Sequence, residues 1–417
     1  MSIKLLKVIA IFFFQFFSHL SFAQMMTTLP PTNPGGLISM RIPFSLMHPK
    51  KGEMTVTMNS SEGNVWLPEV TILEPKELTL TQKALLDSQT YRERALTINN
   101  LNIPNRAYYY KADGTVQSQT IYISDELTDH SEIGISFNVA VLSRGTSVIE
   151  SPVSDEFIES LHSIGIGRYD NFGRRLYPFN QAEITFKDSE GKGLSLHDGD
   201  LFLGTFDLHY IDHIELVHED QNRRVKVLTL NLGAYAGIPM NQYLNELPVG
   251  MSAQLVSSIR LGSNTSLIST IGGSYTRNDL IRWGTPIALV NENSLYQLEG
   301  YLGVSIHHRS GLITTYGIQH EEYSMFAKPI PEMGLIPPVS STNKTPTWWE
   351  LTPDQFGGKA SGFKIPNDQY FDLVVGVQKK NMAVNFFLKE DLKVNNAPDL
   401  QLGIQLIKRF RNKSVHF

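Results

Sequence analysis

The chain has 417 residues, which is enough for one large domain or two ordinary ones. Its 41 acidic and 36 basic residues give a net charge of −5, so its charge offers no case for nucleic-acid binding. The absence of cysteine excludes disulfides, thiolate metal sites and a cysteine-linked lipid anchor.

The N-terminal region has the layout of a secretory signal peptide. Lys4 and Lys7 precede an apolar run over residues 8–17, and the small residues Ser21 and Ala23 form a cleavage site. The run is shorter than the roughly 20 residues that a membrane-spanning helix needs. We therefore predict a signal peptide over residues 1–23 and a flexible, Thr-, Pro- and Gly-rich segment over residues 24–50.

Short segments of alternating polarity follow along the chain. In the clearest, residues 132–142, the large apolar side chains of Ile135 and Phe137 alternate with the small or polar Ser136 and Asn138. Successive side chains of a strand point to opposite faces, so this pattern predicts a strand with one apolar face. We predict about twelve such strands, near residues 52–58, 117–124, 132–142, 202–210, 224–233, 251–261, 266–276, 296–306, 311–320, 371–378, 382–389 and 400–406.

The connections between these strands alternate between short and long. Turns at 263–264, 309–310 and 379–381 are very short, whereas the segments 60–116, 143–199, 234–250, 277–293 and 321–367 are long. Outer-membrane barrels have tight periplasmic turns on one rim and long external loops on the other. The sequence thus predicts an all-β, antiparallel transmembrane β-barrel over residues 51–410 with a C-terminal tail, 411–417, located in the outer membrane of a Gram-negative cell.

Aromatic residues near predicted strand ends suit the interfacial girdles of such barrels. They are Tyr296, Tyr316, Tyr370, Phe371 and Phe410.

The long segment 143–199 has a distinctive pattern. A predicted helix begins after Ser154 and carries Asp155, Ile158 and His162 before a run of arginines. Together with the hairpin around 113–114, the region 105–210 resembles a family of predicted outer-membrane β-barrels known only as a domain of unknown function (DUF3187-like). The residues that carry the resemblance are Gly145, Asp155, Ile158, His162, Gly165, Arg174, Gly199 and Asp200. The resemblance implies the barrel class and no activity.

Two groups of residues are candidates for chemistry. Asp155 and His162 are an acid–base pair of the kind that a rim-active enzyme needs, but no nucleophile motif accompanies them, so we favour a capped helix. His209, His213 and His218 are side chains that suit zinc. Their spacing fits a helix rather than a strand, so we favour a polar periplasmic turn, as for residues 307–308.

The sequence therefore favours a channel or transport barrel without a cofactor. Its partners would be outer-membrane lipid, lipopolysaccharide and the barrel assembly machinery. A rim-active enzyme acting on lipid or peptide, and a barrel that binds surface polysaccharide, remain alternatives. The side chains predicted to line the lumen are Ser136, Asn138, Asp207, Glu299, Asn385 and Gln401.

Overall fold

A computed structural model describes most of the predicted strands. The described residues are 53–73, 107–145, 181–187, 193–217, 225–241, 247–277, 280–281, 294–323, 334–336, 363–364, 368–391 and 400–411. Within these ranges the chain forms strands and turns, and no helix there is long and apolar enough to cross a membrane.

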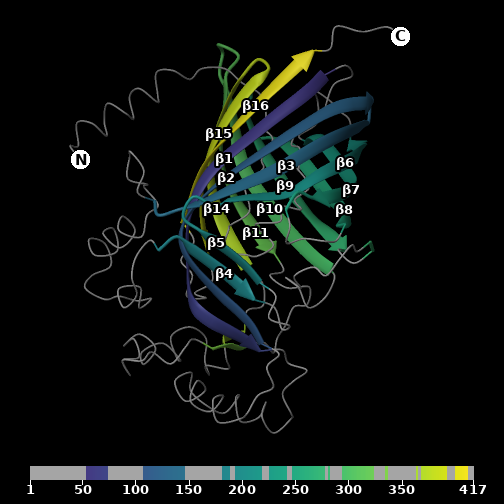
Figure 1. The fold of residues 1–417 in the computed structure, drawn as a ribbon. Coiled ribbons are helices and arrows are strands. Elements are labelled where there is room, and N and C mark those ends of the chain that lie inside the picture. The colour runs from purple at the N-terminus through teal and green to yellow at the C-terminus, as the bar shows by residue number, and fades with distance from the viewer. Residues whose placement is uncertain are drawn as a thin grey trace, which may run out of the picture.

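Twelve of the described strands form a closed antiparallel barrel. Each pairs with the next, and β1 pairs with both β2 and β16, so the barrel has no free edge (Figure 1). Closure satisfies the backbone hydrogen-bonding groups that an open sheet leaves at its edges. The strands are β1 (Glu53–Leu73), β2 (Ala107–Thr128), β3 (Ser131–Ser143), β6 (Leu201–Val217), β7 (Val225–Pro239), β8 (Val249–Arg260), β9 (Thr265–Arg277), β10 (Ser294–His307), β11 (Ile313–Tyr323), β14 (Asp368–Lys379), β15 (Met382–Asp391) and β16 (Leu400–Arg411).

Four short strands form a second sheet region at one end of the barrel. They are β4 (Glu183–Lys187), β5 (Gly193–His197), β12 (Gly334–Ile336) and β13 (Phe363–Lys364). The far part of β2 pairs with β4, and that of β1 pairs with β12, so both strands extend beyond the barrel (Figure 1). The sequence predicts residues 60–116 as a long connection between two strands. That prediction was wrong at both of its ends, because β1 continues to Leu73 and β2 begins at Ala107.

The two rims differ in the length of their connections. On one rim, residues 129–130, 218–224, 261–264, 308–312 and 380–381 join strands, and the barrel begins and ends there at Glu53 and Arg411. The other rim carries the connections 74–106, 144–200, 240–248, 278–293, 324–367 and 392–399. The predicted grouping of the short turns on one rim is confirmed. We call the two ends the short-turn rim and the long-loop rim.

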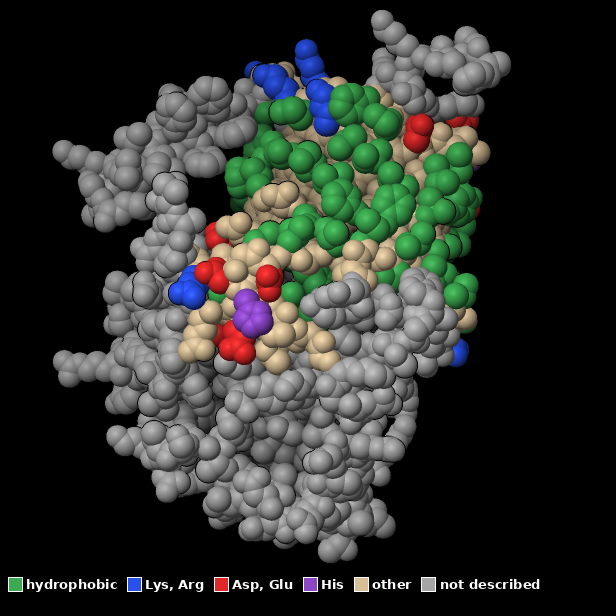
Figure 2. All heavy atoms as spheres, viewed as in Figure 1, with side chains coloured by type: hydrophobic (Ala, Val, Ile, Leu, Met, Phe, Trp, Pro, Cys, Tyr) green, Lys and Arg blue, Asp and Glu red, His purple; other side chains and the backbone are tan. Residues whose placement is uncertain are grey.

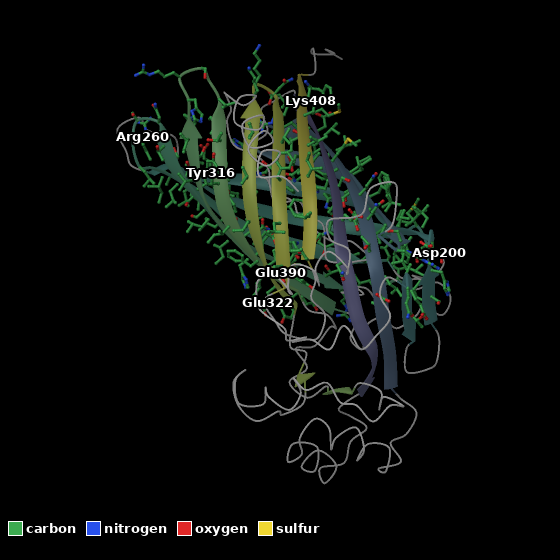
Figure 3. All side chains as sticks on the ribbon, turned by 90° about the vertical axis from the view of Figure 1, so that its left-hand side faces the viewer. Asp200, Arg260, Tyr316, Glu322, Glu390 and Lys408 are labelled. Atoms are coloured by element: carbon green, nitrogen blue, oxygen red, sulfur yellow. The ribbon has the colours of Figure 1, made fainter. Side chains whose placement is uncertain are left out.

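The outer face of the barrel is apolar. Exposed side chains include Phe137, Leu208, Leu298 and Ile271, and green, hydrophobic side chains cover much of the barrel face that is in view in Figure 2. Between them along each strand lie buried, mostly polar side chains such as Asp207. This arrangement inverts that of a soluble β-sandwich, whose inward side chains are the apolar ones.

Large rings inside the barrel lie over glycines. A Cβ atom added to Gly403 would overlap the ring of Phe387, and one added to Gly250 would overlap Tyr235. Tyr301 likewise occupies the space above two glycines, on β10 and β11. Rings that cover glycines fill space where the strands carry no side chain. Part of the interior is apolar as a result, in a cluster made by Ile268, Tyr301, Val374 and Phe387.

Two side chains face the opposite way from the prediction. Phe202, expected to share the outer face with Phe206, is buried. The cause is a β-bulge: between the paired positions 137/206 and 139/203, β6 contains two residues and β3 only one. An extra residue of this kind reverses the alternation of faces beyond it. Tyr370, expected in an interfacial girdle, is also fully buried, whereas Tyr316 and Phe410 are exposed on the outside.

Candidate functional site

The six side chains predicted to line a lumen all lie on the inner face. Each is at most 6% exposed, whereas the apolar side chains that alternate with them on the outer face are exposed. The inner side chains bond to one another: Thr120 donates to Asn138 Oδ1 at 3.0 Å, Asn385 to Gln405 Oε1 at 2.5 Å, and Gln401 to Ser61 Oγ at 2.8 Å. The inner face is therefore a polar, closely packed surface.

A buried ion pair lies near the long-loop rim. Lys389 Nζ donates a short hydrogen bond to Glu321 Oε2 and lies 3.8 Å from Asp372 Oδ2, and all three side chains are fully buried. Gln319 Nε2 donates to the other oxygen of Glu321 at 2.6 Å. The lysine also lies 5.7 Å from the centre of the Tyr370 ring. These five residues form what we call the lysine cluster.

The lysine cluster joins three consecutive strands. Gln319 and Glu321 lie on β11, Tyr370 and Asp372 on β14, and Lys389 on β15. Removing ions from water is costly, and their attraction offsets that cost only with good geometry and further hydrogen bonds. One lysine thus faces two carboxyl groups in the described part of this cluster.

A second group, the histidine cluster, lies midway along the barrel on β2, β3, β6 and β7. Ser136 Oγ lies 2.7 Å from His209 Nε2 and donates to Asp207 Oδ2 at 3.3 Å. The Tyr122 ring meets the His209 ring edge-on, with 5.6 Å between the ring centres. The centre of the Tyr235 ring lies 6.0 Å from the centre of the His209 ring. All five side chains are at most 5% exposed.

The histidine cluster contains the residue types of a serine hydrolase but not their arrangement. In a catalytic triad the carboxylate binds His Nδ1, and the other ring nitrogen accepts the serine proton. Here Asp207 accepts the proton of Ser136, so the serine oxygen can only accept from Nε2–H of His209. The basic nitrogen, Nδ1, then faces away from the serine, which is not activated as a nucleophile.

A third set of contacts lies nearer the short-turn rim. Tyr122 donates to Glu132 Oε1 at 3.1 Å, and Glu132 Oε2 lies 3.9 Å from His213 Nε2. The other nitrogen of His213 is 2.8 Å from Asn231 Oδ1. Through Tyr122, this set is continuous with the histidine cluster, so polar contacts extend from the middle of the interior toward the short-turn rim.

The predicted histidine turn is wrong, because β6 continues through both histidines to Val217. His209 and His213 both face inward, but four residues of strand separate their Cα atoms by roughly 13 Å, too far to share a metal ion. Within the described ranges, no group of three or more metal-binding side chains is present, and His218 lies outside those ranges. His308 does lie in a short turn, where its backbone amide bonds to Leu312.

The candidate acid–base pair of the enzymatic alternative, Asp155 and His162, lies outside the described residues, as does the predicted helix that carries it. The same holds for the predicted signal peptide, the segment 24–50 and residues 412–417.

The inward-facing ionisable side chains that the structure describes are predominantly acidic. The alternation of each strand assigns eight carboxylates to the inner face, namely Glu53, Glu126, Glu132, Asp207, Glu215, Glu299, Glu321 and Asp372. It assigns three basic side chains to the same face, namely Arg260, Lys389 and Arg409. This imbalance gives the interior a negative charge when these groups are ionised.

Sequence reasoning missed the lysine cluster although its pattern was visible. Lys389 and Asp372 alternate with apolar neighbours and so belonged to the predicted inner face, but Glu321 lies one residue beyond the predicted end of its strand. Only the pairing of β11 with β14 and of β14 with β15 brings the three together.

No family model matches the chain, and neither does any curated protein, so the resemblance over residues 105–210 stays a prediction.

Among solved structures, an outer-membrane channel from Pseudomonas putida F1 is similar at 10% identity and a TM-score of 0.38, over 87% of this chain and 96% of that one. The NanC porin is similar at 7% identity and a TM-score of 0.32, over 71% of this chain and 95% of the porin. LpxR from Salmonella typhimurium is similar at 7% identity and a TM-score of 0.35, over 84% of this chain and 99% of LpxR. At such values none of them assigns a substrate or a reaction to this chain.

Proposed function

We propose that this protein is an outer-membrane β-barrel that passes small polar solutes through its interior. The observation that carries the proposal is the inversion of polarity along the strands, with Phe137 and Leu298 exposed outside and Ser136 and Glu299 buried inside. An apolar outer face is stable in a lipid bilayer and not in water. Lipid, lipopolysaccharide and the barrel assembly machinery would then be its partners.

Polar groups at every level of the interior support passage rather than a purely structural role. They run from Glu132 near the short-turn rim, through Asp207 in the middle, to Glu321 and Lys389 near the long-loop rim. Barrels of eight strands have interiors that side chains can fill, and those of sixteen or more leave an aqueous channel. A twelve-stranded barrel lies between these, so its passage depends on how the inner side chains are arranged.

The inner side chains are buried in this structure, so we interpret it as a closed state. Opening would require the inner contacts to separate, and the lysine cluster joins strands at the long-loop rim. No observation on the described residues favours the enzymatic alternative.

Conductance in planar lipid bilayers tests the proposal. The full chain, folded in detergent and added to the bilayer, should give discrete current steps that protein-free detergent does not give. Glu321→Gln removes one partner of the ion pair while Asp372 still faces the lysine, and it should increase the time spent open. Folded wild-type and variant proteins that neither conduct nor admit small sugars or amino acids into liposomes would contradict passage.

A further inference from the structure

Three buried polar atoms of the histidine cluster have no hydrogen-bond partner among the described residues. They are Asp207 Oδ1, His209 Nδ1 and the hydroxyl oxygen of Tyr235, on side chains that are 1%, 1% and 4% exposed. Buried polar atoms without a partner are rare in folded proteins and call for an explanation, such as a water molecule or an ion. Two of the three, Asp207 Oδ1 and His209 Nδ1, belong to side chains two residues apart on β6, which suggests one bound group.

Asp207 and His209 are neighbours on the inner face of β6, two residues apart. His209 on β6 is the direct partner of Tyr235 on β7, and Asp207 is the partner of Gly237. Asp207 Oδ1 occupies the space that a Cβ on Gly237 would take, so this oxygen leans toward β7, whereas the hydroxyl of Tyr235 lies over Gly250 of β8.

The hydrogen bonds of Ser136 determine what these atoms need. Because the serine gives its only proton to Asp207 Oδ2, it accepts from His209 Nε2–H, and a neutral His209 then presents a lone pair at Nδ1. Asp207 Oδ1 is also an acceptor. A group that satisfies both must bring hydrogen-bond donors, and a ligand that carries only acceptors, such as a phosphate or a carboxylate, does not fit.

We propose that the histidine cluster is a binding site for a small cation with N–H donors, a primary ammonium group. The charge of an ammonium suits Asp207 and the surplus of inner carboxylates, since carboxylate-lined passages favour cations. Its N–H groups suit Asp207 Oδ1 and His209 Nδ1. The inference rests on the proposed function, because a solute must enter the interior to reach this site, and it adds the class of that solute.

Thermal unfolding of the full chain in detergent tests the site without measuring current. Methylammonium chloride should raise the unfolding midpoint in a saturable way, since a ligand that binds the folded state stabilises it. Tetramethylammonium chloride has the same charge and no N–H donor, and it should have no more effect than potassium chloride at equal concentration.

A matched pair of variants locates the effect. Asp207→Asn removes the charge but keeps an oxygen for Ser136, and it should weaken the apparent affinity for methylammonium roughly tenfold. Asp212→Asn makes the same change on the outer face of the same strand and should leave that affinity unchanged. Should Asp207→Asn fail to fold, the comparison of the three salts on the wild-type protein still decides.

Equal effects of the three salts on the wild-type protein, or an undiminished methylammonium effect in folded Asp207→Asn, would overturn the site. The two proposals fail separately. A barrel that binds methylammonium and carries no current keeps the site and loses passage, whereas one that conducts without a specific methylammonium effect keeps passage and loses the site.

Discussion

Lys389 on β15 and Glu321 on β11 form an ion pair across the intervening strand β14, with both side chains fully buried inside the barrel. The pair is not isolated, because Asp372 on β14 lies between the strands and within 3.8 Å of the lysine. The single lysine thus faces two carboxylates, so removing the lysine and removing one carboxylate have different consequences for the cluster.

The unequal charges predict an asymmetry between variants. Lys389→Met leaves two buried carboxylates without their cation and should lower the free energy of unfolding by about 3–5 kcal/mol. Glu321→Gln leaves Lys389 paired with Asp372, so it should lower the free energy of unfolding clearly less than Lys389→Met does. Urea unfolding of the barrel folded in lipid vesicles measures both values, and equal losses for the two variants would show that the charges act independently.

Packing of a ring over a glycine gives a second prediction. Gly403→Val places a side chain where the Phe387 ring lies, and such overpacking should destabilise the barrel by about 1–3 kcal/mol. Combining it with Phe387→Ala should recover part of that loss, because the ring that causes the overlap is gone. A double-mutant cycle measures the coupling, and strictly additive effects would argue against this contact.

The outer face predicts sensitivity to charge. Phe137 is exposed near the middle of β3, and Phe137→Arg should cost about 2–4 kcal/mol if that position faces the middle of the bilayer. Phe137→Leu is the matched control and should change stability little. Heat resistance of the folded form in detergent reports the difference, and a folded Phe137→Arg protein that is monomeric and soluble without detergent would contradict the membrane location.

The two rims predict an orientation. The turn that contains Ser310 should face the periplasm, and the connection between β11 and β14, which contains Asn343, should face the outside. Epitope tags inserted at each position, probed on intact cells, should be accessible at Asn343 only. Labelling at Ser310 alone would reverse the topology, and opening the cells provides the control that both tags are present.

Alternation of polarity was sufficient to predict the twelve barrel strands, because a barrel that separates lipid from a polar interior requires it along every strand. It failed where the pattern itself is interrupted. Ser60, Ser61 and Glu62 carry no apolar side chain, so the alternation of polarity stops well before the end of β1 at Leu73. The extension is held by pairing with β2 and β12, which local sequence does not reveal.

The end of β6 was misread for a related reason. Asp212, His213 and Glu215 looked like a polar turn, yet Ile214 and Leu216 continue the exposed apolar face on the alternate positions. The charged Asp212 on the outer face concealed that continuity. The inner clusters could not be predicted as clusters, because contact between residues on three strands depends on register, and register follows from the pairing of the whole sheet.

Closure of the barrel by its first and last strands has a consequence for folding. β1 cannot complete its pairing until β16, at the far end of the chain, is in place, and joining distant segments carries the largest entropic cost of loop closure. Until then both strands present unpaired edges, which promote association with other chains. The seam between β1 and β16 is thus the contact expected to form late, and a chain lacking β16 would remain an open sheet prone to aggregate.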